Sequence, residues 1–244
     1  MTGDVLLQVE GLAKRFGGVQ AVVDLSFELR EGEILGMIGP NGSGKTTTFN
    51  LITGFYRPDR GSARFAGRDI TGLPPYEVCA RGICRTFQVA KPFRELTVLR
   101  NVMMAALLRH PDPAEAEARA AALLRQVGLE GRAHAEAGSL TTIDQRRLEV
   151  ARALGTEPRL VLLDEAMAGL NPTEMAEAMR LIAGLRERGL TVVVVEHVMR
   201  AVMSLSDRIV VLDQGTKIAE GNPAAVASDP RVIQAYLGVE YRHA

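Results

Sequence analysis

Cysteine occurs at only two positions, Cys79 and Cys84, and tryptophan does not occur at all. Two cysteines can build neither a disulfide framework nor a four-ligand zinc site, so the fold must depend on its hydrophobic core. A net charge is also lacking, because 29 Lys and Arg residues balance 29 Asp and Glu residues. Since nucleic-acid-binding proteins usually carry a basic excess, we expect no nucleic-acid partner.

Long apolar segments are missing as well. No apolar run approaches the roughly 18 residues that indicate a membrane-spanning helix. The N-terminal residues lack the basic-then-apolar pattern of a signal peptide. We therefore expect a cytoplasmic protein that reaches a membrane only through a partner. Its 244 residues suffice for one large domain or for a domain with an insertion.

Strand-like and helix-like segments alternate along most of the chain. Strands are expected at residues 5–9, 21–29, 34–38, 63–66, 83–87, 160–163, 191–195, 209–213 and 217–220. Helices are expected at residues 45–53, 172–188, 197–205 and 223–237, with a helical turn near 75–81. Short apolar strands between helices predict an α/β fold with a mostly parallel sheet covered on both faces, preceded by an antiparallel β region.

The middle of the chain has a different character. Residues 98–108, 114–127 and 144–154 are expected to be helical, and prolines and glycines separate them. We interpret this block as an inserted helical subdomain at residues 92–155. The chain is then a single domain over residues 1–244, with a core and its β region at residues 1–91 and 156–244.

A glycine-rich motif follows the strand expected at residues 34–38. It fits the pattern G-x-x-x-x-G-K-[ST], in which backbone N–H groups turn inward around phosphate oxygens and the next helix adds its N-terminal dipole. Lys45 would reach the β- and γ-phosphates, and the Thr46 hydroxyl would hold Mg²⁺. The expected phosphate-binding residues are Gly39, Pro40, Asn41, Gly42, Ser43, Gly44, Lys45, Thr46 and Thr47.

Two further strands end in polar side chains. Asp164 and Glu165 follow the apolar residues 160–163, and Glu196 and His197 follow the β-branched run at residues 191–195. Ligands of open α/β sheets bind at the carboxyl ends of the strands. Asp164 would help to hold Mg²⁺, Glu165 would deprotonate the attacking water, and His197 would contact the γ-phosphate.

These motifs and the helical insertion together resemble an ATP-binding cassette (ABC) subunit, with a P-loop ATPase core that uses ATP and Mg²⁺. The resemblance implies that Phe16 stacks on adenine and that Gln88 touches Mg²⁺ and senses the membrane partner. It also implies that residues 169–172 cross to a second ATPase subunit. In this family two ATP molecules lie between two subunits arranged head to tail, and each ATP also meets the opposite subunit's signature helix.

The resemblance can be narrowed. Residues 49–58, 85–88, 168–172 and 235–238 are similar to the larger ATPase subunit of bacterial branched-chain amino-acid importers. That likeness implies membrane permease partners, a different second ATPase subunit, an indirect link to a solute-binding protein, and a place on the inner face of the cell membrane. Export of a lipid or polysaccharide is the alternative within transport.

The signature segment departs from the family pattern Leu-Ser-x-Gly-Gln. Its residues are Leu140, Thr141, Thr142, Ile143 and Asp144, so a hydroxyl is kept while the glycine and the glutamine are lost. Ala166 also replaces the usual proline after the Asp-Glu pair. We therefore expect two unequal ATP sites, which favours a heterodimer. A regulatory subunit with low turnover is the alternative, although Glu165 and His197 argue against it.

Overall fold

The structure is a computed structural model, and residues 3–86 and 91–240 are described. The N-terminal part forms an antiparallel sheet in the order β2-β1-β4-β5. Its strands are β1 (Val5–Phe16), β2 (Val19–Arg30), β4 (Arg60–Phe65) and β5 (Arg68–Asp69). The expected antiparallel β region is confirmed, and β1 is longer than residues 5–9.

A second, larger sheet has the strand order β10-β9-β3-β8-β7-β6. All neighbours are parallel except β10, which forms a hairpin with β9. The strands are β3 (Ile34–Ile38), β6 (Ile83–Arg85), β7 (Leu160–Asp164), β8 (Thr191–Val195), β9 (Arg208–Asp213) and β10 (Thr216–Gly221). Every residue of β3, β7 and β8 is buried, as expected for parallel strands covered on both faces.

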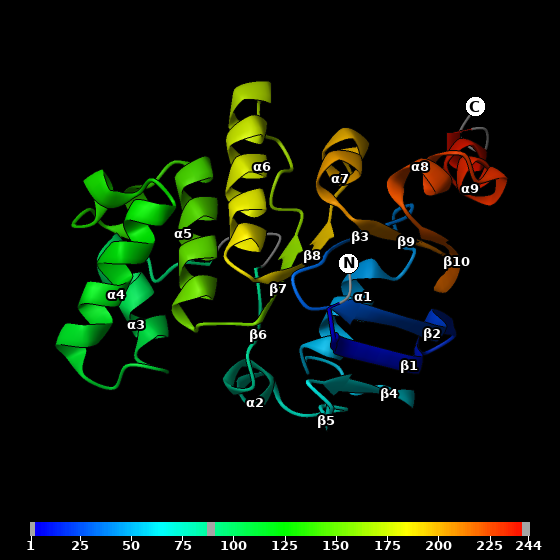
Figure 1. The fold of residues 1–244 in the computed structure, drawn as a ribbon, viewed down its shortest axis with the longest axis horizontal. Helices are drawn as coiled ribbons and strands as arrows, with labels where there is room; N and C mark the ends of the chain where they lie inside the picture. Colours follow the sequence, from blue (N-terminus) through cyan, green and yellow to red (C-terminus); the bar gives the residue numbers. More distant parts are fainter. Residues whose placement is uncertain (1–2, 87–90, 241–244) are drawn as a thin grey trace.

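The two faces of the large sheet supply two different cores. Leu35 of β3, Leu162 of β7 and Val193 of β8 pack with the antiparallel sheet and α1 (Lys45–Ile52). Their neighbours Ile34 and Val161 point the other way, into a core shared with α6 (Pro172–Glu187). This alternation follows from the period of two along a strand. In Figure 1, α6 and α7 (Met199–Leu205) lie above the sheet, and the antiparallel sheet lies below it.

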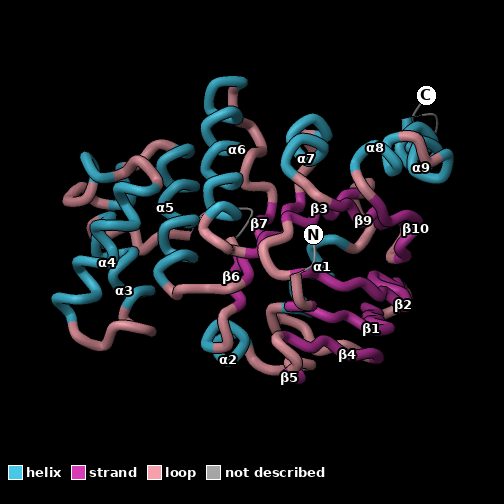
Figure 2. The backbone as a smooth tube through the Cα atoms, viewed as in Figure 1, coloured by secondary structure: helices cyan, strands magenta, loops and turns pink. Residues whose placement is uncertain are grey.

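Helices α3 (Val98–Ala106), α4 (Pro113–Gln126) and α5 (Thr142–Gly155) form a block beside α6, at the left in Figures 1 and 2. Short 3₁₀ helices at Glu130–Arg132 and Ala137–Ser139 connect α4 to α5. Side-chain oxygens of Thr97, Asp112 and Thr141 cap the three helices, which explains where each begins. Besides α1, helix α2 (Pro75–Ala80) precedes this block in the described part of the chain.

The prediction of one continuous helix at residues 223–237 is wrong. The tail forms two helices, α8 (Pro223–Ala227) and α9 (Pro230–Glu240). Pro230 restricts the residue before it and cannot donate a helical hydrogen bond, so the first helix must end before it. Among the helices of the described residues, none is long and apolar enough to cross a bilayer.

Candidate active site

The loop between β3 and α1 has a conformation that only glycine allows at two positions. Gly39 and Gly44 have φ angles of 152° and 104°. A Cβ atom on Gly39 would lie 2.0 Å from the Leu212 carbonyl oxygen, and one on Gly44 would lie 2.4 Å from the Ala21 carbonyl oxygen. The loop is therefore held against strands β9 and β2 so closely that no side chain fits.

Lys45 begins helix α1 and is a buried cation, with 6% of its surface exposed. Its Nζ donates to the carbonyl oxygens of Gly39 (2.8 Å) and Pro40 (3.0 Å). Burial lowers the pKa of Lys45, although the negative charges of Glu165 and Asp164 act in the opposite direction. The ammonium group thus lies at the loop, within electrostatic reach of both carboxylates that the sequence predicts for the site.

Thr46 and Thr47 stand in the first turn of α1, where Thr46 is exposed and Thr47 is half-buried. Asn41 and Gly42 are also exposed on the loop, whereas Ser43 is buried and its carbonyl accepts from the Gly215 N–H. Exposed residues therefore lie on the loop and in the first turn of α1, at a helix N-terminus, which is an arrangement suited to phosphate.

Asp164 ends β7 and is 2% exposed. Its Oδ2 accepts from Nη2 of Arg85 at 2.9 Å, and Nη1 of Arg85 donates to Oδ1 of Asn50 at 2.5 Å. Burial raises the pKa of Asp164, and the nearby Arg85 counteracts this. The pairing of Arg85 with the predicted metal carboxylate is a feature that the sequence did not predict.

Glu165 follows in a left-handed backbone conformation, with φ of 51°. A residue with a Cβ pays roughly 1–2 kcal/mol for this conformation, so surrounding contacts must hold it. Its N–H donates to the Val195 carbonyl at 2.8 Å, and its Oε1 lies 2.7 Å from Nε2 of His197. The structure thus joins two residues that the sequence placed at the ends of two different strands.

Glu196, the neighbour of His197, has no role predicted from the sequence, yet its side chain is buried, with 2% exposure. Its Oε1 accepts from the Met167 N–H at 2.6 Å. Its Oε2 is buried and has no hydrogen-bond partner among the described residues. Burial raises the pKa of Glu196 to about 7, and the charge of Glu165 acts in the same direction. A buried carboxyl group therefore lies directly behind the predicted base.

Phe16 lies at the end of β1 and is 42% exposed. Its ring makes an edge-to-face contact with Tyr56, with 5.1 Å between ring centroids, and Lys14 Nζ lies 5.6 Å from the Phe16 centroid. The adjoining strand β2 reaches the phosphate loop, where the Ala21 carbonyl faces Gly44. An exposed aromatic ring on the hairpin beside the loop is suited to stacking on a base. Tyr56 is a partner that the sequence did not indicate.

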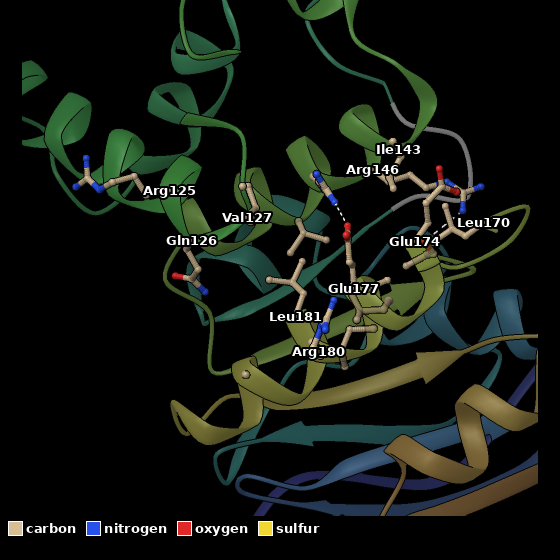
Figure 3. A pocket seen from close by; sticks show the side chains of 18 of the residues that line it. Arg125, Gln126, Val127, Ile143, Arg146, Leu170, Glu174, Glu177, Arg180 and Leu181 are labelled. Carbon is tan, nitrogen blue, oxygen red and sulfur yellow. Dashed lines mark hydrogen bonds and ion pairs between the residues drawn. The ribbon is translucent and has the colours of Figure 1, made fainter. Parts of the chain in front are cut away.

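The signature segment lies elsewhere, at the start of α5. Thr141 caps this helix by accepting the Asp144 N–H at 3.3 Å, and Thr142 is exposed beside it. Asp144 is turned toward its own helix, with Oδ1 3.6 Å from Nη1 of Arg147. Ile143 is half-buried and lines a cavity of about 490 Å³ between α5 and α6, together with Arg146 and Leu170 (Figure 3).

In Figure 1 helix α6 separates α5 from the phosphate loop at α1, so within one chain the two motifs do not meet. Leu140, the first residue of the segment, is buried at 7% exposure and accepts from the Gln145 side chain. Gln88 lies outside the described residues, as do residues 89 and 90. The next segment is described: Lys91 N–H donates to Glu149 Oε1 at 3.0 Å, and Phe93 is 49% exposed.

Magnesium suits the donors at this edge of the sheet. No group of three or more His, Cys, Asp or Glu side chains that could hold a metal occurs within residues 3–86 and 91–240. Mg²⁺ does not require one, since it commonly takes one or two protein oxygens together with phosphates and water. The Thr46 hydroxyl and the buried Asp164 carboxylate are oxygen donors of this kind.

Comparisons with known proteins agree with this arrangement. The family described as "ABC transporter" matches residues 22–168, and the family described as "Branched-chain amino acid ATP-binding cassette transporter" matches residues 216–242. The chain is 46% identical to the high-affinity branched-chain amino acid transport ATP-binding protein LivG of Salmonella typhimurium, over 96% of this chain and 98% of that protein.

A second relative is the lipopolysaccharide export system ATP-binding protein LptB of Acidithiobacillus ferridurans, which is 37% identical over 97% of this chain and 98% of its own length. Among solved structures, the ADP conformation of an ATP-binding cassette of an ABC transporter superposes with a TM-score of 0.87 at 32% identity, covering 96% of this chain and 99% of the other. The chain therefore belongs to the ABC transporter family and is one of its ATP-binding, ATP-hydrolysing subunits.

Proposed function

We propose that the chain hydrolyses ATP to drive a membrane importer of branched-chain amino acids. The observation that supports this most is the meeting of Lys45, Asp164 and the Glu165–His197 pair at the carboxyl ends of β3, β7 and β8. The assignment of the import substrate depends on the relatives. The sequence identity to LivG is higher than that to LptB, and the family matched at residues 216–242 is described as a branched-chain amino acid transporter.

In this proposal the exposed N–H groups of the phosphate loop and the Lys45 ammonium bind the β- and γ-phosphates, and Phe16 stacks on the adenine. Thr46 and Asp164 hold Mg²⁺, with Gln88 as a further ligand. When bound, Mg²⁺ neutralises negative charge on the phosphate oxygens. Arg85 would have to release the Asp164 carboxylate or share it with Mg²⁺, since Arg85 now pairs with that carboxylate.

Glu165 accepts a proton from the attacking water, and His197 holds the Glu165 carboxylate through the 2.7 Å contact while it faces the γ-phosphate. The exposed position of His197, at 43% of its side chain, leaves its ring open to the nucleotide. General-base catalysis of this kind contributes typically about 10²–10⁴-fold in rate.

We further propose that residues 92–155 form the inserted helical subdomain and act on the ATP of a second ATPase subunit, through Thr141, Thr142 and the α5 N-terminus. The exposed side chain of Phe93, held in place where Asn101 binds its N–H and carbonyl groups, contacts a membrane permease. The assembly then includes two ATPase subunits, preferably different ones, and permeases on the cytoplasmic face of the membrane. A solute-binding protein meets only the permeases.

The test is reconstitution of the chain in vesicles with the permeases and solute-binding protein that co-purify with it. ATP hydrolysis should rise when the binding protein carries leucine, and leucine should enter the vesicles. Glu165→Gln should abolish both while ATP binding persists, because the amide cannot take a proton from water. If leucine changed nothing and a lipid substrate stimulated hydrolysis instead, the import assignment would be wrong. If Glu165→Gln hydrolysed ATP at the normal rate, another group would be the base.

A further inference from the structure

The loop that begins with Glu165 is held from two neighbouring elements. The Val195 carbonyl of β8 accepts the Glu165 N–H, and the carboxyl of Glu196, the residue after β8, accepts the Met167 N–H at 2.6 Å. From α5, Nη1 of Arg146 donates to the Ala166 carbonyl at 3.2 Å. The contacts of Val195 and Glu196 hold the chain at Glu165 and two residues later, so they are well placed to hold the left-handed conformation of Glu165.

Glu196 is an expensive residue at this position. Its side chain is buried, and its Oε2 has no hydrogen-bond partner within the described part of the chain. A buried polar atom without a partner destabilises a fold, and residues of this kind are concentrated at functional sites. The raised pKa of Glu196 records the same cost, because burial disfavours its charge.

The same side chain is linked to the predicted chemistry through its neighbours. His197, the next residue, contacts Oε1 of Glu165, and Met167 lies two residues after Glu165. The loop then continues through Gly169 and Leu170 to Asn171, which caps α6 with its side chain. Movement of the Met167 backbone would therefore shift both Glu165 and residues 169–172, which by the family resemblance cross to the second subunit.

We propose that Glu196 is a positioning residue: its bond to the Met167 N–H holds the left-handed turn at Glu165, so that the base stays against His197. This inference rests on the proposed function of Glu165. It assigns no proton transfer to Glu196, which contacts the backbone of the loop and not the base itself.

The experiment compares Glu196→Ala and Glu196→Gln in the reconstituted transporter. Alanine removes the acceptor, whereas glutamine keeps an oxygen that can accept the Met167 N–H. We expect kcat of Glu196→Ala to fall about tenfold or more with ATP affinity within about twofold, since only the placement of the base changes. Glu196→Gln should retain kcat within about threefold of the parent, because a neutral acceptor makes a weaker bond.

Two further measurements separate positioning from general damage. Hydrogen exchange of the peptide at residues 165–171 should be faster in Glu196→Ala and near normal in Glu196→Gln. Val192→Ala, a buried change at the opposite end of β8, should lower the unfolding temperature and leave kcat unchanged. An unchanged kcat in Glu196→Ala would overturn the inference, as would equal losses in the alanine and glutamine variants.

The experiment distinguishes failure of the positioning role of Glu196 from failure of the proposed role of Glu165. If Glu165→Gln is inactive and Glu196→Ala is fully active, Glu165 is the base and Glu196 does not position it. If Glu165→Gln is fully active, Glu165 is not the base, and the positioning role of Glu196 is then overturned together with the assignment that it rests on. A loss of ATP affinity in Glu196→Ala as large as the loss of kcat would also contradict positioning.

Discussion

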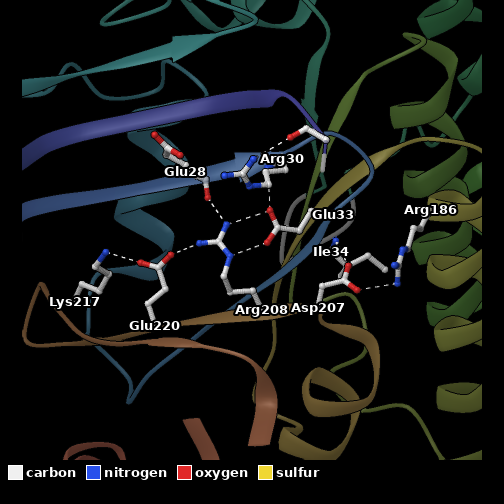
Figure 4. Close-up of polar contacts among 10 residues, drawn as sticks. Glu28, Arg30, Glu33, Ile34, Arg186, Asp207, Arg208, Lys217 and Glu220 are labelled. Carbon is white, nitrogen blue, oxygen red and sulfur yellow. Dashed lines mark hydrogen bonds and ion pairs between the residues drawn. The ribbon is translucent and has the colours of Figure 1, made fainter. Parts of the chain in front are cut away.

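Both ends of the large sheet carry buried charged side chains, but the partners of these side chains differ between the two ends. At the amino end, Arg208 of β9 donates to both oxygens of Glu33, at 2.8 and 3.1 Å, and also pairs with Glu220 of β10 (Figure 4). Burial works to lower the pKa of Arg208, but the bonds and charges of Glu33 and Glu220 raise it. Nearby, Arg186 of α6 pairs with Asp207 at 3.0 Å.

At the carboxyl end, burial outweighs the partners that the charged groups have. Burial lowers the pKa of Lys45 and raises the pKa values of Asp164 and Glu196. Glu165 adds a strained backbone. The amino end of the sheet is therefore built for stability, and the carboxyl end is built for a ligand, as expected when groups with shifted pKa values lie together at a site.

The largest expected effect is loss of nucleotide binding in Lys45→Ala. The Lys45 ammonium lies at the phosphate loop, and its removal should weaken ATP binding by roughly 100-fold, comparable to losing a charge-assisted contact to phosphate. Binding of a fluorescent ATP analogue measures this. Lys217→Ala is the matched control, because Lys217 Nζ donates to the Ser26 carbonyl and to Glu220 and not to the phosphate loop. ATP affinity should therefore stay unchanged in this variant. Equal affinities for the parent and Lys45→Ala would contradict the assignment of the loop.

The phosphate loop could be predicted because all of its determinants are contiguous in the sequence. Gly39, Gly44 and Lys45 fix the backbone and the charge within one strand–loop–helix unit. The strand ends at Asp164 and His197 were predictable for a related reason, since parallel strands bring their carboxyl ends to one edge. These interpretations required only the order of segments, not their detailed packing.

The pairs that cross between segments could not be predicted. Arg85 and Asp164 are 79 positions apart, and Glu196 and Met167 are 29 apart. Their contacts depend on the register of β6, β7 and β8, which no local pattern determines. From the sequence alone, Glu196 is expected to be a solvent-exposed charge, and only the structure shows that its side chain is buried. The break before Pro230, by contrast, has a local signal in the sequence, because a residue before proline, here Asp229, disfavours the helical conformation.

The second prediction concerns stability at the amino end. Arg208→Met leaves the buried Glu33 carboxylate without its principal partner, and breaking a buried pair costs several kcal/mol. Because the Arg208 side chain is 24% exposed, we expect the lower range, about 2–3 kcal/mol of unfolding free energy. Denaturant unfolding at pH 7 measures this, and ATP affinity of the folded protein should not change.

Arg231→Met is the matched control for that experiment. Arg231 pairs with Asp229 at 2.7 Å, but 69% of its side chain is exposed. An exposed pair contributes little, so the unfolding free energy should stay nearly the same. If both arginine variants were equally stable, the contrast between paired burial and surface pairing would be lost. If Arg208→Met lost ATP affinity instead, the two ends would not be independent.

The third prediction is that Glu196→Gln stabilises the fold at neutral and alkaline pH. The pKa of Glu196 is raised from 4.5 to about 7, so the folded state binds this proton more tightly than the unfolded state. Stability from the neutral carboxyl is therefore lost as pH rises toward 7, and the ionised group costs up to about 3 kcal/mol above that pH. Glutamine never ionises and avoids this cost.

Unfolding experiments at pH 8 and pH 5 measure the difference. Glu196→Gln should exceed the parent by about 1–3 kcal/mol at pH 8, and the gap should shrink toward pH 5. A constant gap at both pH values would mean that the carboxyl group does not titrate in this range. A Glu196→Gln variant that is more stable but has a lower kcat would support the contrast between the two ends of the sheet. It would show that the carboxyl end gives up stability for the sake of activity.

The smallest expected effect is at the signature segment, where Ile143→Gly with Asp144→Gln restores the residues that the family pattern has. A close backbone approach to ATP is easier without the β-branched Ile143 side chain. Asp144 repels phosphate, but Arg147 lies 3.6 Å from its Oδ1 and offsets part of that charge. Two unit charges about 5 Å apart repel by roughly 3 kcal/mol at an effective dielectric near 20, and Arg147 reduces this to a change of a few-fold in rate. We therefore expect the ATPase rate of the double variant to rise a few-fold when this chain is assayed alone, because both ATP sites then use this signature segment. The increase should be smaller with the partner ATPase, because one ATP site then uses the partner's signature segment.

Ile143→Ala is the control for packing, because Ile143 lines the cavity between α5 and α6 and its loss alone relieves no charge. Rates that stay unchanged both alone and with the partner would show that Thr141, Thr142 and the α5 N-terminus are sufficient, and that the two ATP sites are equal.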